Sequence, residues 1–91
     1  MSVEIKRSVS AGTMESSDAY VEIEPAAAGV AVQLESVVQE QFGEQIRSVV
    51  WEVLKEHEVE NASIRVIDRG ALECVIRARV ETAILRGKEG A

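Results

Sequence analysis

Residues 36–57, SVVQEQFGEQIRSVVWEVLKEH, change the apolar period of the chain from two residues to between three and four. The apolar positions of this stretch are Val38, Phe42, Ile46, Val49, Val50, Val53 and Leu54. Polar residues occupy the opposite face, so the pattern predicts an amphipathic helix over 36–57. Ser36 followed by Gln39 three residues later predicts a capping box at its start. Gly43 is the weakest position, because glycine costs about 1 kcal/mol relative to alanine inside a helix.

Upstream of this helix, three segments alternate between apolar and polar residues. They cover residues 3–10, 19–24 and 30–35, and a period of two is typical of half-buried strands. Pro25 ends the second strand because it has no backbone N–H to donate. The first two strands form a hairpin whose tip, residues 12–18, is small, polar and longer than usual.

Downstream, residues 62–67 predict a fourth strand and residues 68–70 a turn. A second amphipathic helix follows over 71–86, and residues 87–91 form a flexible tail. The apolar stripe of this second helix consists of Leu72, Val75, Ile76, Val80, Ala83 and Ile84. The order β-β-β-α-β-α predicts an α+β fold with a small sheet of about four strands and both helices packed on one face. We expect one domain over residues 1–91.

The composition excludes several classes of function. A net charge of −6 is opposite to the clustered basic charge that nucleic acids and anionic membranes require. No apolar run is long enough to span a bilayer, and the N-terminus lacks the apolar stretch of a signal peptide. Cys74 is the single cysteine, so it has no partner for an internal disulfide. A cytoplasmic location is the expectation that follows.

No residue in the sequence is equipped for catalysis or metal binding. His57, the only histidine, is expected to be an ordinary residue at the helix C-terminus, and it has no partner that would suggest a metal site. Cys74 is expected to be a buried or half-buried thiol. Trp51 is expected to anchor the edge of the core, with partner contact as the alternative. Arg77, Arg79 and Arg86 are expected to pair with nearby glutamates, docking on an acidic partner being the alternative.

The hairpin tip contains two adjacent serines, Ser16 and Ser17. Loop serines commonly just form turns. A catalytic serine needs a neighbouring base and an oxyanion hole, and the sequence indicates neither. A serine that another enzyme modifies only has to be exposed on a loop that can enter an active site. Ser16 meets that requirement, as do many serines.

Three spaced motifs resemble the citrate lyase acyl carrier protein family, the gamma subunit. Residues 11–18 read Ala-Gly-Thr-Met-Glu-Ser-Ser-Asp, against the family's Ala-Gly-Thr-Leu-Glu-Ser followed by Gly or Ser and then Asp. Residues 41–47, QFGEQIR, are similar to its Gln-Phe-Gly-x-x-Ile-Arg. Residues 68–79, DRGALECVIRAR, are similar to its Asp-x-Gly-Ala-Leu-Asp-Cys-x-x-Arg-Ala-Arg. Met14 in place of leucine is a conservative departure.

The resemblance implies that Ser16 carries a phosphoribosyl-dephospho-coenzyme A arm through a phosphodiester bond, within an attachment motif of Gly12, Thr13, Glu15, Ser17 and Asp18. It implies that the chain is not itself an enzyme but a carrier that presents acetyl and citryl thioesters to two partners. The alpha subunit exchanges acetyl for citryl, and the beta subunit releases oxaloacetate. A prosthetic-group transferase is the third implied partner.

Two alternatives remain open on the sequence. The carrier subunit of malonate decarboxylase is similar to this family and uses the same kind of arm, although its sequence should lack the second and third motifs. An α+β interaction module without a prosthetic group would instead use Trp51 and the helix faces to bind a partner. A stand-alone enzyme has the least support.

Overall fold

The two central strands of the sheet carry the most deeply buried side chains. In the computed structural model, which describes residues 3–89, β2 (Ala19–Pro25) pairs antiparallel with β4 (Ala62–Asp68). Val21 lies opposite Val66 and Ile23 opposite Ile64, and none of the four is more than 1% exposed. Because side chains alternate along a strand, all four point to the same face and form the centre of the core.

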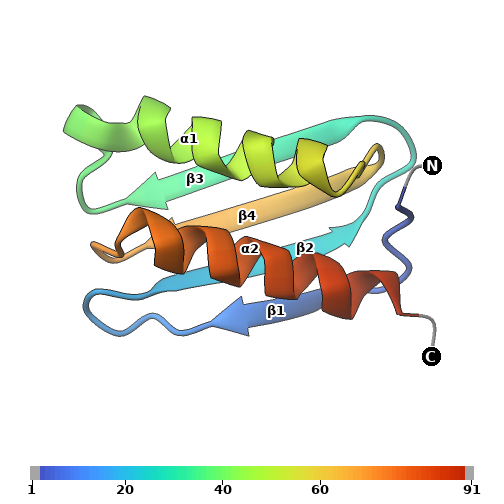
Figure 1. Cartoon of the computed structure of the whole chain (residues 1–91), viewed down its shortest axis with the longest axis horizontal. Helices are drawn as coiled ribbons and strands as arrows, with labels where there is room; N and C mark the ends of the chain where they lie inside the picture. Colours follow the sequence, from blue (N-terminus) through green and yellow to red (C-terminus); the bar gives the residue numbers. More distant parts are fainter. Residues whose placement is uncertain (1–2, 90–91) are drawn as a thin grey trace.

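The outer strands complete a sheet of order β1-β2-β4-β3. β1 (Val9–Gly12) pairs antiparallel with β2, and β3 (Val30–Ser36) pairs parallel with β4. Parallel neighbours need a crossover, which α1 (Gln39–Glu56) supplies; α2 (Glu73–Lys88) follows β4. The order β-β-β-α-β-α and the α+β class are confirmed. Figure 1 shows both helices on one face of the sheet, with their N-termini at the same end of the molecule as the β1–β2 loop.

The helices bury the apolar stripes that their periodicity predicts. α1 buries Ile46, Val49, Val50, Val53 and Leu54, and α2 buries Ile76, Val80, Ala83 and Ile84. Between the helices, Arg77 of α2 pairs with Glu52 and, at 3.3 Å, with Glu56 of α1; within α2 it pairs with Glu73 at 3.9 Å. Neither helix within residues 3–89 is long and apolar enough to cross a membrane.

The predicted strand over residues 3–10 is wrong in its extent, because β1 begins only at Val9. Val3 makes an isolated bridge to Val59, and the Lys6 amide donates a 2.8 Å hydrogen bond to the Gly87 carbonyl. Ile5 is nonetheless only 2% exposed. The alternation in this segment records side-chain burial, which does not require pairing in a sheet.

Two predicted helix ends also differ. The capping box is wrong: α1 begins at Gln39 and its N-cap, Val38, makes no side-chain cap bond. The Ser36 hydroxyl instead accepts a 3.1 Å hydrogen bond from the Val38 amide and donates one of 2.7 Å to the buried Asp68. α2 continues to Lys88 and buries Gly87, so the predicted tail begins too early; residues 90 and 91 of that tail lie outside the described residues.

Three side chains expected in or beside the core are exposed. Phe42 is 45% exposed, Leu72 is 72% exposed, and Cys74 is also exposed. Phe42 lies near the start of α1, which reaches past the tip of β3 (Figure 1), and Leu72 is the N-cap of α2, ahead of its first buried residue. Cys74 lies two positions before the buried Ile76, so the helical period places it on the face of α2 turned away from the sheet. Periodicity indicates which face of a helix is apolar, but not where the surface beneath that face ends.

Candidate functional site

Ser16 lies at the apex of the loop that joins β1 to β2, and it is exposed. The Asp18 amide donates a 3.1 Å hydrogen bond to the Glu15 carbonyl, which closes a turn with Ser16 and Ser17 at its centre. Ser17 has a φ of 66° and donates its amide to the Arg69 carbonyl at 2.8 Å. A positive φ is the conformation that glycine adopts most easily, so serine is strained at position 17 and glycine would not be.

Asp18 fixes this loop to the rest of the fold through several hydrogen bonds. Its carboxylate accepts hydrogen bonds from the Thr13 hydroxyl at 2.6 Å and the Ala19 amide at 2.7 Å. It also accepts two from the Arg79 guanidinium on α2, at 3.0 and 2.9 Å. Bidentate arginine–carboxylate pairs are geometrically specific. The loop is therefore more constrained than the sequence alone suggested.

These hydrogen bonds, first those from Arg79 and then those from Thr13 and the Ala19 amide, hold the pKa of Asp18 well below its usual range. A depressed carboxyl pKa stabilises the fold above the pKa of the unfolded chain, about 3.9 for aspartate, and this contribution is lost as the pH falls further. We therefore expect an Asp18→Asn variant to be less stable than the parent at pH 7, with a gap that narrows below about pH 4. Urea unfolding from pH 7 to pH 2.5 measures that gap; a gap independent of pH would contradict this role for Asp18.

Gly12, the last residue of β1, allows the two strands of the hairpin to approach closely where the loop begins. Its φ is +91°, and a Cβ placed there would lie 1.9 Å from the Ala19 carbonyl oxygen and 3.0 Å from the Arg79 Cδ. No side chain fits that space. Glycine is thus required where β1 enters the loop.

Two further loops meet the hairpin tip at this end of the molecule. The Arg69 amide donates to the Asp18 carbonyl at 2.9 Å, the reciprocal of the bond from Ser17 to Arg69. Asp68, only 1% exposed, accepts bonds from Ser36 and from the Ala71 amide. The β4–α2 loop is therefore hydrogen-bonded to both the hairpin tip and the end of β3, and these bonds hold the loop that carries Ser16 in place.

This arrangement presents a hydroxyl and does nothing to activate it. Within residues 3–89, no hydrogen bond to the Ser16 side chain is formed. His57 caps the far end of α1, where its Nε2 lies 3.5 Å from Glu81. No group of three or more potential metal ligands occurs in the described part of the chain. The chemistry at Ser16 would have to come from another protein.

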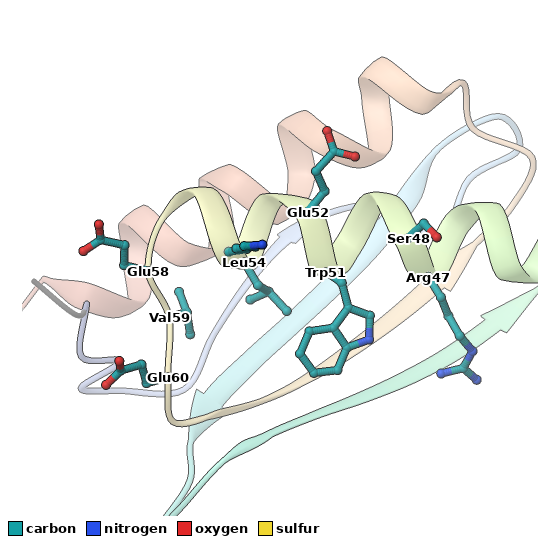
Figure 2. Close-up of a pocket in the computed structure, with 9 residues that line it drawn as sticks. Arg47, Ser48, Trp51, Glu52, Leu54, Glu58, Val59 and Glu60 are labelled. Carbon is teal, nitrogen blue, oxygen red and sulfur yellow. The ribbon is translucent and has the colours of Figure 1, made fainter.

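A large groove lies elsewhere, along α1 and the turn after it (Figure 2). It has a volume of about 930 Å³ and includes Arg47, Trp51 and Glu60. Trp51 is 45% exposed and forms part of the groove wall, while Arg47 donates to the Val32 carbonyl at 3.3 Å. The groove shares no residue with the hairpin tip and opens toward the opposite end of α1 from Ser16.

The structure brings Gly12, Thr13, Glu15, Ser17 and Asp18 together around Ser16, as their adjacency requires. Arg79 is the residue of this site whose role the sequence did not reveal, since glutamates were its expected partners. It lies 61 positions from Asp18 in the chain. The only signal was the presence of both residues in separate motifs with opposite charge.

Comparisons with known proteins agree on the family. Residues 6–87 match the acyl carrier family model described as malonate decarboxylase delta subunit. The citrate lyase acyl carrier protein of Pectobacterium atrosepticum is 51% identical, with 88% of this chain and 83% of that protein covered. That of Klebsiella pneumoniae is 48% identical, with 96% and 91% covered, and that of Latilactobacillus sakei is 44% identical, with 93% and 84% covered.

A solved structure shares the fold. The chain superposes on a chain from the Pseudomonas malonate decarboxylase hetero-tetramer in complex with malonate, with a TM-score of 0.81 and 20% identity, covering 93% of this chain and 88% of that one. At this identity the likeness concerns the fold alone. The curated relatives, at 44–51% identity over most of the chain, distinguish citrate lyase carriers from malonate decarboxylase carriers. The chain therefore belongs to the citrate lyase acyl carrier proteins, which are carrier subunits and not catalysts.

Proposed function

We propose that this chain is the acyl carrier subunit of a citrate lyase complex and that Ser16 is the residue to which its phosphoribosyl-dephospho-coenzyme A arm is attached. The observation that carries the proposal is an exposed serine at the apex of a hydrogen-bonded loop, in a chain whose curated relatives are citrate lyase carriers. Ser17 is the competing residue. Its positive φ and the hydrogen bond that its amide donates to the Arg69 carbonyl give it a structural role in the turn.

The site fits a covalent group better than a non-covalent one. The serine is exposed and its hydroxyl makes no hydrogen bond within residues 3–89, so it is available for bond formation. Attachment requires an activated donor, a polyphosphate ester of the same arm. Attachment would join the Ser16 Oγ to the innermost phosphorus of the donor as a phosphodiester, with pyrophosphate as the leaving group and the hydroxyl proton passing to a base of the transferase or to water.

Once the arm is attached, its terminal thiol supplies the thioester chemistry that exchanges acetate for citrate and releases oxaloacetate. This chain contributes position and reach. Thr13, Asp18 and Arg79 hold the loop at a fixed place, and a tether keeps the reacting group at a high effective concentration near two active sites. The alpha and beta subunits of citrate lyase and the prosthetic-group transferase are the proposed partners, and the cytoplasm is the proposed location.

A malonate decarboxylase-type carrier is the second candidate, because the matching family model carries that description. The test is substrate choice. We expect the modified chain to support cleavage of citrate to acetate and oxaloacetate with citrate lyase alpha and beta subunits. We expect it not to support release of carbon dioxide from malonate with malonate decarboxylase subunits. Activity with malonate and not with citrate would favour the malonate decarboxylase-type carrier. Activity with neither set of subunits would favour an interaction module without a prosthetic group, which could use the groove at Trp51 to bind a partner.

A further inference from the structure

Large apolar side chains are concentrated at the end of the molecule that bears Ser16. Six large hydrophobic residues are exposed in the described chain, and four of them lie at this end: Met14, Val37, Phe42 and Leu72, at 49%, 64%, 45% and 72% exposed. We call these four residues the collar. They come from four separate segments, the hairpin tip, the β3–α1 loop, α1 and the N-cap of α2.

The four collar residues line two separate hollows at this end of the molecule. Met14 and Val37 line one hollow of about 410 Å³, and Phe42 and Leu72 line another of about 240 Å³. Both hollows are bordered by Asp68. The backbone bonds between residues 17–18 and Arg69, the neighbour of Asp68, connect this surface directly to the loop that carries Ser16.

Four exposed hydrophobic residues from separate segments are not needed for folding. Exposed apolar surface is unfavourable in water, and a concentration of exposed apolar side chains at one end of a small protein favours an interaction site there. Phe42 lies near the start of α1 and Leu72 at the N-cap of α2, both ahead of the buried stripes. Their exposure is local to this end, since the same stripes are covered further along both helices.

The charged residues around the collar indicate which charge a partner surface should carry. Four exposed glutamates, Glu15, Glu35, Glu40 and Glu73, belong to the same segments or border them. Arg65 and Arg69 are exposed cations beside them. Arg65 pairs with Glu22, whereas no carboxylate pairs with the Arg69 guanidinium in the described residues. An apolar patch with an acidic rim is complementary to an apolar patch with a basic rim.

We propose that the collar is the docking surface for the transferase that installs the arm on Ser16, and that this enzyme presents an apolar surface with a basic rim. The inference rests on the proposed function and extends it to a partner. A serine hydroxyl lies close to its own backbone, so the transferase has to bring its active site against the loop and the residues around it. Subunits that use the finished arm act at its far end, away from the Ser16 hydroxyl.

The chain offers a matched pair of variants for the test. Leu72→Ser and Leu85→Ser make the same change on the same helix, about 20 Å apart at 1.5 Å per residue. Leu85, 39% exposed, lies near the end of α2 remote from Ser16. Leu72 is the N-cap of α2 and provides no cap bond, and serine is a preferred N-cap residue. Leu72→Ser should therefore fold at least as well as the parent.

The rate of modification is measured by intact mass, with the transferase and the polyphosphate donor supplied to each variant. We expect Leu72→Ser to lower kcat/KM for modification by about tenfold, in the range of an interface anchor, while Leu85→Ser stays within about twofold. Phe42→Ser, the second collar variant, should fall with Leu72→Ser. Raised salt should slow modification of the parent, because screening weakens attraction between an acidic and a basic rim.

Three results would overturn the inference. Equal rates for Leu72→Ser and Leu85→Ser would remove the collar from the transferase interface. A dimer of the parent that Leu72→Ser dissociates, with no loss of modification rate, would assign the collar to a second copy of the chain. A collar variant that is modified normally, but fails to support citrate cleavage once modified, would assign it to the catalytic subunits. A parent that acquires no mass would overturn the proposed function itself, which is a separate outcome.

Discussion

Replacing Ser16 with alanine is expected to abolish the carrier function completely. The variant lacks the only atom through which the proposed arm is attached, so a mixture with the alpha and beta subunits should cleave citrate no faster than a mixture without carrier. Ser16 is exposed and its side chain makes no hydrogen bond within residues 3–89, so the fold should change by less than about 0.5 kcal/mol. Citrate cleavage is followed by the appearance of oxaloacetate, and urea unfolding checks the fold.

Ser17→Gly is the matched control for that experiment. It removes the neighbouring hydroxyl while providing the residue that best tolerates the φ of 66° at this position. We expect it to support cleavage at the parental rate. If Ser17→Gly is inactive and Ser16→Ala is active, the attachment site lies one residue further along the chain.

Gly12→Ala is expected to cause the largest loss of stability among single changes at the loop. The methyl group would have to occupy space 1.9 Å from the Ala19 carbonyl oxygen, at a φ of +91°. Backbone strain and the clash together should cost about 3 kcal/mol or more. For a domain of this size that corresponds to a fall in the thermal midpoint of roughly 12 °C or more.

Gly29→Ala separates the two causes. Gly29 has a similar φ of +81°, but nothing lies within 4 Å of a Cβ built there. It should therefore show the backbone strain alone, about 1 kcal/mol. Thermal unfolding of both variants gives the comparison, and equal losses would mean that the contact with Ala19 does not matter.

Local pattern was sufficient for most of the fold. The alternation over 19–24 and 30–35 and the three-to-four spacing over 36–57 predicted β2, β3 and α1, because each of these elements buries one face against the same core. The limits of prediction came from tertiary contacts. The Ser36 hydroxyl bonds to Asp68, 32 positions away, so it does not cap the helix that begins beside it. Ile5 is buried without joining a strand, so its alternation was mistaken for sheet pairing.

The candidate site likewise has a part that the sequence predicts and a part that depends on tertiary contacts. Ser16 and its neighbours could be predicted because the motif is contiguous, and the resemblance to a family distinguished Ser16 from other loop serines. The contact between Asp18 and Arg79 could not, since it depends on α2 lying over the hairpin. The exposure of Phe42 and Leu72 could not be predicted either, because helical periodicity does not show where the sheet beneath a helix ends. Those two residues became the basis of the proposed transferase surface.

The most direct test of the central claim is to locate the added mass on the chain. The protein is produced together with the prosthetic-group transferase and its donor, digested, and the peptide spanning residues 11–18 is fragmented in a mass spectrometer. The proposal predicts that the full mass of a phosphoribosyl-dephospho-coenzyme A group lies on Ser16 and that Ser16→Ala yields only unmodified peptide. The same mass on Ser17, or an unmodified parent protein in the presence of an active transferase, would contradict it.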